Sequence, residues 1–227
     1  LIGNKGCDPL CEWTDHYINL SYFGVKGFIT ISGFLIFKSL ERSPNVLDYL
    51  WKRILRIYPG LIIVLLLSVG MAYIIYQPKQ TYFKFEKEAV SYILNNLTLY
   101  HNQWRIHGVF DKNVNTAING SLWTMGFEFF FYLVLLFLFP FRQFKWLVIS
   151  ILILTILGLL YGNIFHIASL KHINFKLRVD FIVELGFFFL IGSFWAVLDW
   201  KNIPYRTLLA LLALIAQIFG HFLFGGG

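Results

Sequence analysis

Four polar side chains, spaced three or four residues apart, lead into an apolar run. They are Ser121, Thr124, Glu128 and Tyr132. On a helix this spacing places them along one face. In a membrane span that face should turn toward the bundle interior or a wet cavity, because lipid cannot satisfy it. There Glu128 can orient a catalytic base, hold an acceptor hydroxyl or take part in proton transfer. The alternative is a structural carboxyl hydrogen-bonded between helices, and the spacing leaves both interpretations open.

A cation cluster precedes another apolar run. Lys52 and Arg53 lie four and three residues before Arg56, so both can neighbour it on a helix. Pro59 suits the first turn of a helix, and a helix that starts there would add free N–H groups and a positive dipole end to the cluster. These features predict a phosphate-binding site at the membrane surface. The alternative is a plain anchor for lipid headgroups.

Other ionisable residues give weaker signals. Lys26 is a second charge within an apolar run, with Asp15 or Glu128 as candidate partners, and Asp180 and Glu184 are assigned to the membrane interface. None of the six histidines has a metal-ligand spacing such as H-x-x-x-H. No metal site is therefore predicted.

The composition indicates a membrane protein. Of 227 residues, 58% are hydrophobic and 14% are charged, whereas a soluble domain has about 45–50% apolar and about 25% charged residues. One polytopic membrane domain fits this length better than two soluble domains. The net charge of +7 is assigned to membrane-protein loops. Because no soluble basic stripe or nucleic-acid motif is present, no nucleic-acid partner is expected.

Six apolar runs approach the roughly 20 residues that a spanning helix needs. They are 20–37, 57–76, 122–140, 146–161, 181–198 and 207–224. We predict an all-α, polytopic transmembrane helix bundle that forms a single domain over residues 1–227. We expect it to be a fragment of a larger bundle, truncated before the first helix and at the C-terminus.

Lysine and arginine predict the orientation of the bundle. They are more than twice as dense in segments 38–56, 141–145 and 199–206 as in segments 77–121 and 162–180. By the positive-inside rule the first set is cytoplasmic and the long segment 77–121 is extracytoplasmic. The Arg53 cluster and Glu128 are therefore expected toward opposite faces of the membrane.

Several short motifs occur in one order along the chain. They are Gly24-Val25 with Ser32-Gly33-Phe34-Leu35-Ile36, then Arg53-x-x-Arg56-Ile57-Tyr58-Pro59, then Gly108-Val109-Phe110, and finally Asn119-Gly120-Ser121-Leu122-Trp123-Thr124 with Glu128. Each motif alone is weak, but the ordered set resembles the acyltransferase family 3 membrane proteins. The resemblance is faintest after about residue 145.

The resemblance implies an O-acyltransferase of the bacterial inner membrane. Such enzymes move an acyl group, usually acetyl, from cytoplasmic acyl-CoA to a hydroxyl of an extracytoplasmic glycan such as O-antigen, capsule or exopolysaccharide. Arg53 and Arg56 match the family's R-x-x-R pair for binding acyl-CoA, and Lys52, the neighbouring cation, is predicted to bind the donor with them. The family's Asn-Gly-Ser-Leu-Trp-Thr…Glu segment, which lies near the acceptor side, is matched here by Asn119, Ser121, Trp123, Thr124 and Glu128. Acyl-CoA is a co-substrate, and no bound cofactor is implied.

The chain also departs from the family pattern. The family's central catalytic histidine belongs to a first helix expected upstream of this chain, so Glu128 is given a supporting role. Lys26 stands where relatives often carry an acidic, polar or apolar residue. Two rival functions remain open. One is a transporter or flippase for a glycan or lipid precursor, although no repeats are visible, and the other is an inactive scaffold relative.

Overall fold

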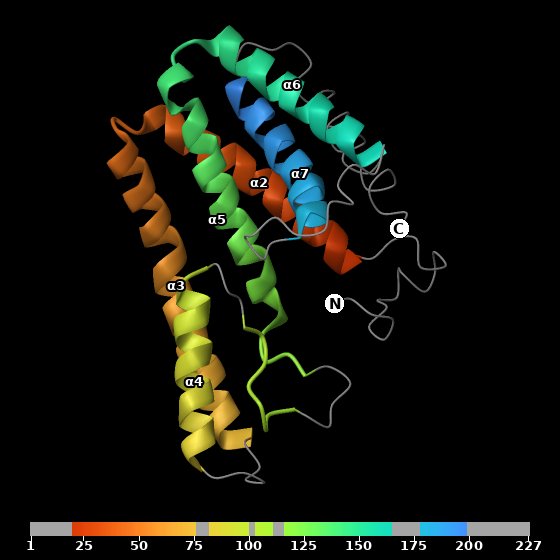
Figure 1. The fold of residues 1–227 in the computed structure, drawn as a ribbon. Coiled ribbons are helices and arrows are strands. Elements are labelled where there is room, and N and C mark those ends of the chain that lie inside the picture. Colours follow the sequence, from red (N-terminus) through yellow and green to blue (C-terminus); the bar gives the residue numbers. More distant parts are fainter. Residues whose placement is uncertain (1–19, 76–81, 100–102, 111–115, 165–177, 199–227) are drawn as a thin grey trace. The chain divides into compact units, whose positions relative to one another are not determined.

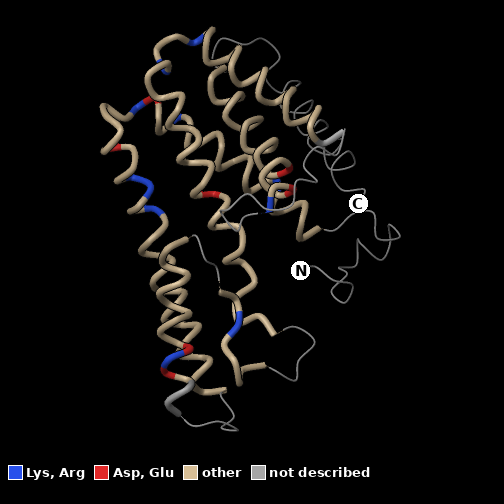
Figure 2. Tube along the Cα trace, in the orientation of Figure 1, with Lys and Arg blue, Asp and Glu red and all other residues tan. Residues whose placement is uncertain are grey.

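A computed structural model of the chain describes residues 20–75, 82–99, 103–110, 116–164 and 178–198. Within these ranges every regular element is a helix, and five helices are long and apolar enough to cross a membrane. Acidic and basic residues are sparse along them (Figure 2). The predicted all-α membrane bundle is confirmed, and the chain is an integral membrane protein. The sixth predicted span, 207–224, lies outside the described residues.

The described helices belong to two compact units. The first contains α2 (Leu20–Arg42), η2 (Leu136–Phe141), α6 (Lys145–Ile164) and α7 (Val179–Val197). Within this unit, α7 packs against both α2 and α6 (Figure 1). The predicted spans at 20–37, 146–161 and 181–198 correspond to α2, α6 and α7.

Small residues bring α2 and α7 into backbone contact. A Cβ atom on Gly33 would lie 2.0 Å from the Phe189 carbonyl oxygen, and one on Gly192 would lie 1.9 Å from the Thr30 carbonyl oxygen. The Ser193 hydroxyl donates to the carbonyls of Phe189 at 3.0 Å and Gly33 at 3.2 Å. Gly33 and Gly192 therefore allow the two helix backbones to pack closely, since any larger residue would clash.

The helices α2 and α7 run in the same direction. Lys26 pairs with Glu184 near the N-terminal ends of both helices, and Gly33 contacts Ser193 further along both. A chain that crosses the membrane alternately must have its first and fifth spans parallel. The arrangement within this unit agrees with such a path.

The second unit contains α3 (Val46–Ile75), α4 (Tyr82–Leu97), η1 (Gly120–Leu122) and most of α5 (Trp123–Leu135). The Asn45 side-chain oxygen accepts the Asp48 N–H at 2.7 Å, and this cap starts α3 at Val46. The prediction of a helix start near Pro59 is therefore wrong. Pro59 lies inside α3, where its ring removes one backbone hydrogen bond, a loss that membrane helices tolerate.

The helix α4 packs along α3 in the opposite direction (Figure 1). The rings of Tyr73 and Phe85 lie 5.9 Å apart, and the Tyr58 hydroxyl donates to the Leu97 carbonyl oxygen at 3.1 Å. The sequence predicted only a long loop between two spans here. The structure folds part of that loop into a helix that returns along α3.

Candidate functional site

Arg53 lies two turns inside α3 and is 6% exposed. Its guanidinium carbon stands 5.6 Å from the centre of the Tyr49 ring, which is one turn earlier on the same helix, and 5.8 Å from the Tyr132 ring of α5. Aromatic faces attract a cation at such distances. They give the buried charge a compensating environment that lipid would lack.

Glu128 joins the same cluster from α5. It is 4% exposed, and its Oε1 atom accepts a hydrogen bond from the Tyr132 hydroxyl one turn later. The Tyr49 hydroxyl donates to the Tyr132 backbone carbonyl at 3.1 Å, which fastens α3 to α5. The Glu128 carboxyl also acts electrostatically on the Arg53 guanidinium. We call Tyr49, Arg53, Glu128 and Tyr132 the Arg53–Glu128 cluster.

The structure thus brings together two groups that the sequence predicted toward opposite faces of the membrane. The cause is the early start of α3, which puts Arg53 within the helix and not in a surface loop. Of the predicted stripe, Thr124, Glu128 and Tyr132 share α5, while Ser121 lies in the preceding 3-10 turn η1. Tyr49 was missed by sequence reasoning, although its position four residues before Arg53 is the spacing that could have revealed it.

The other two predicted donor-binding cations lie nearer the surface. Arg56 is exposed, while the Lys52 side chain is 41% exposed. Lys52 forms an ion pair of 2.6 Å with Asp48, one turn earlier, and a hydrogen bond of 3.4 Å with Ser43. The predicted trio is therefore divided into one buried cation and two accessible ones.

The predicted acceptor segment forms the turn that opens α5. The Asn119 side-chain oxygen accepts the Ser121 N–H at 2.9 Å and caps η1. The Thr124 hydroxyl donates to the Ser121 carbonyl at 3.1 Å. Trp123 is half-buried and stands edge-on to Phe127 at 5.9 Å. These side chains shape the turn that precedes Glu128 on the same helix.

A second buried ionic centre lies in the first unit. Lys26 is fully buried, and its Nζ atom pairs with Glu184 Oε1 at 2.9 Å. The Tyr22 hydroxyl donates to the other carboxyl oxygen of Glu184, and the Lys26 ammonium lies 4.7 Å from the Tyr22 ring. Among the described residues the partner is Glu184 and not Glu128, and the candidate partner Asp15 lies outside the described residues. Of the two acidic residues predicted at the interface, Glu184 is thus largely enclosed, whereas Asp180 is exposed and forms a surface ion pair with Arg178.

The Arg53–Glu128 cluster offers acid–base and electrostatic chemistry. A carboxyl bonded to a phenol and near a guanidinium can hold a hydroxyl, orient a base or exchange a proton. Among the described residues, no group of three His, Cys, Asp or Glu side chains could hold a metal ion.

Comparison with known proteins points to one chemistry. The family profile described as an acyltransferase domain matches residues 8–227. A protein named O-acetyl transferase, from Shigella phage Sf6, is 30% identical over 110 residues. That match covers 47% of this chain and 31% of the relative, so the chain spans about a third of the protein it matches. No solved structure matches the chain significantly.

Proposed function

The chain belongs to the acyltransferase family whose domain profile covers almost its full length, and on that premise we propose that it O-acylates a glycan across the membrane. The donor is acyl-CoA on the cytoplasmic side, and the acceptor is a hydroxyl of an extracytoplasmic glycan. The site of action is the bacterial inner membrane. The O-acetyl transferase of the phage supports the choice of an oxygen acceptor and of acetyl as the acyl group.

The donor-side proposal rests on the three cations of α3. Arg56 and Lys52 are accessible from outside the protein and can meet the phosphates of acyl-CoA. Arg53 is buried against the aromatic rings beside Glu128, so we assign it to the acyl end of the donor. There it would stabilise the negative charge that develops on the thioester oxygen.

Glu128 serves the acceptor in this proposal. The acceptor oxygen forms a bond to the acyl carbon, the carbon–sulfur bond breaks, and the sulfur of CoA leaves as a thiol after taking up a proton. The hydroxyl proton passes to a base that Glu128 positions or assists, with the Tyr132 phenol holding the carboxyl in place. Asn119, Ser121, Trp123 and Thr124 shape the turn through which the acceptor is reached.

One observation carries the proposal. Arg53 and Glu128 belong to different motifs, 75 positions apart in the chain by their residue numbers, and the structure places them in one buried cluster with Tyr132 between them. A charge inside membrane helices costs about 2.5–3.5 kcal/mol on insertion, and such a residue is a candidate for function by default.

The test is transfer of labelled acetyl from acetyl-CoA to glycan in membranes that contain the protein. Glu128→Gln should lower kcat by about 10²–10⁴-fold, the range for a lost acid–base group. Arg56→Ala should raise the KM for acetyl-CoA roughly tenfold or more, because a hydrogen bond to a charged group is lost. Lys38→Ala is the control, since Lys38 is another helix cation in a surface ion pair with Glu41.

Membrane insertion is measured in parallel by protease protection. Unchanged transfer by Glu128→Gln would return this residue to a structural role. Unchanged acetyl-CoA KM in Arg56→Ala would remove the phosphate role. Glycan export without any labelled product in the wild-type protein would favour a transporter instead.

A further inference from the structure

The helix α4 reaches the depth of the membrane core. Its last residue, Leu97, bonds to Tyr58 of α3. The 30 residues of α3 span about 45 Å at about 1.5 Å per residue, whereas the hydrocarbon core takes up about 30 Å, or about 20 residues. Every window of that length within Val46–Ile75 contains Tyr58. Whichever part of α3 lies in the core, the inner end of α4 lies in it too.

The same helix does not cross the membrane. It has 16 residues, or about 24 Å, and it begins beside the C-terminal end of α3 and runs back toward Tyr58. After α4 the chain turns, and residues 103–110 follow without regular structure. The segment thus enters and leaves on the side where α3 ends, which the charge pattern predicts to be extracytoplasmic.

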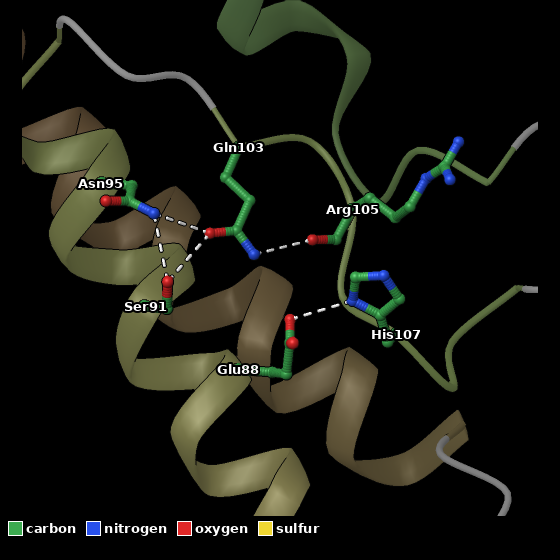
Figure 3. A network of polar contacts seen from close by, with 6 residues as sticks. All are labelled: Glu88, Ser91, Asn95, Gln103, Arg105 and His107. Atoms are coloured by element: carbon green, nitrogen blue, oxygen red, sulfur yellow. Dashed lines mark hydrogen bonds and ion pairs between the residues drawn. The ribbon is translucent and has the colours of Figure 1, made fainter.

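A ladder of polar contacts joins α4 to the returning chain (Figure 3). At its outer end His107 Nδ1 lies 3.2 Å from Glu88 Oε2. Further in, the Gln103 side-chain oxygen accepts from the Asn95 amide at 2.9 Å and from the Ser91 hydroxyl at 3.3 Å. From Glu88 to Asn95 the ladder descends seven residues of α4, which is about 10 Å.

The inner end of the ladder closes the turn. The Asn96 amide donates to the Tyr92 carbonyl and to the Gln103 carbonyl, both at 2.8 Å, and its oxygen accepts the Gln103 N–H at 3.2 Å. Asn96 is 1% exposed, so the irregular backbone is satisfied by protein on this side. Irregular backbone at membrane depth persists where it is buried in protein or borders water.

On the other side of the ladder the polar side chains are partly or fully exposed on the protein surface. Ser91, Asn95 and Gln103 are half-exposed, while the His107 side chain is 70% exposed and Arg105 is exposed. The ladder bonds satisfy part of these groups, but lipid could not solvate the exposed Arg105 guanidinium or the exposed parts of the amides, so this side must border water or a polar ligand. Amide and hydroxyl groups both donate and accept hydrogen bonds, as sugar hydroxyls do, and the Arg105 guanidinium donates them, so together these groups can bind a glycan.

The ladder also leads to the predicted acceptor segment. The Ile118 N–H donates to the Trp104 carbonyl at 2.9 Å, next to Gln103. The residue after Ile118 is Asn119, the cap of η1 and the start of the turn before Glu128. A ligand that follows the ladder inward therefore arrives at the opening of α5.

We propose that α4 and residues 103–107 form a re-entrant polar wall, which admits the glycan acceptor from the extracytoplasmic side and binds its hydroxyls through Ser91, Asn95, Gln103 and Arg105. This inference deepens the proposed function and rests on it for the identity of the ligand. The re-entrant course of the wall rests on the structure alone. The two parts therefore need separate measurements.

Cysteine accessibility tests the course of the wall. In a background with Cys7 and Cys11 replaced by serine, Ser91→Cys and Asn95→Cys should react in intact cells with a membrane-impermeant maleimide. Leu94→Cys is the matched control on the same helix, because Leu94 is 58% exposed but apolar and should face lipid. If neither ladder position is labelled, or if position 94 is labelled equally, the re-entrant polar wall does not border water and this part of the proposal is overturned.

Acceptor kinetics test the ligand. Asn95→Leu should raise the KM for glycan about two- to tenfold, the range for one hydrogen bond between neutral groups. Arg105→Ala should raise it about tenfold or more, because the donor that is lost is charged. Both variants should leave the KM for acetyl-CoA unchanged. Glu86→Gln, an exposed position of α4 outside the ladder, should change neither. If the glycan KM is unchanged while the cysteines are labelled, acceptor binding is overturned, but the water-exposed course of the re-entrant polar wall still stands. If the wild-type protein transfers no acetyl group, the proposed function fails while the labelling result still stands.

Discussion

Replacing Gly33 with alanine would disrupt one of the two close backbone contacts between α2 and α7. The added Cβ would lie 2.0 Å from the Phe189 carbonyl oxygen, and ordinary van der Waals contact begins at 3.4 Å. The helices would have to separate locally by roughly 1.4 Å, which also lengthens the bond between Ser193 and the Gly33 carbonyl. Backbone atoms on both sides leave no flexible side chain that could yield.

The expected loss of stability follows from two opposing contributions. Overpacking costs typically about 1–3 kcal/mol, and a clash between backbones belongs at the upper end. Alanine gains about 0.5–1 kcal/mol over glycine within a helix. The net loss for Gly33→Ala is about 2 kcal/mol, which corresponds to roughly 4–8 °C in the melting temperature of a chain of this size.

Thermal unfolding of the detergent-solubilised protein measures this effect. Gly158→Ala in α6 is the control, because a Cβ there would meet nothing within 4 Å. That variant should be as stable as the wild type or gain up to about 1 kcal/mol. A Gly33→Ala protein that melts at or above the wild-type temperature would refute the backbone contact between the two helices.

Two further substitutions probe the buried polar centres. Lys26→Met should cost about 3–5 kcal/mol of stability because it leaves the Glu184 carboxyl buried without its cation. The double variant Lys26→Met with Glu184→Met should recover most of that loss. If the double variant is no more stable than the single variant in thermal unfolding, the ion pair is contradicted. Tyr132→Phe should lower kcat about tenfold or more, since Glu128 loses a charge-assisted hydrogen bond, and it should leave the acetyl-CoA KM unchanged. Tyr49→Phe, which loses a bond to a backbone carbonyl, should affect stability more than kcat, and the reverse result would contradict the assigned roles.

Hydrophobic run length was enough to find most of the fold. Each of the five described membrane helices overlaps a predicted span, because about 20 apolar residues in a row have few alternatives to a membrane helix. The start of α3 was missed because its first residues are charged and amphipathic. The Asn45 cap and the ion pair between Asp48 and Lys52 are local signals that mark it.

The candidate site was only partly visible in the sequence. The stripe of Thr124, Glu128 and Tyr132 follows from helical periodicity and was found. The meeting of Arg53 with Glu128 depends on how α3 and α5 pack, which no local pattern encodes. The partner of Lys26 was missed for the same reason. Several acidic residues were available, and the choice of Glu184 is made by the contact between α2 and α7.

The ion pair between Lys26 and Glu184 has a consequence for how the chain is made. Its partners lie about 160 residues apart in sequence, so at roughly 5–20 residues per second the ribosome supplies Glu184 about 8–30 seconds after Lys26. Until then α2 lies in the bilayer without the Glu184 carboxyl beside Lys26, and its mean hydropathy of 1.5 is the lowest among the five apolar helices. The ion pair between α2 and α7 can therefore form only late in synthesis, when α7 has been made.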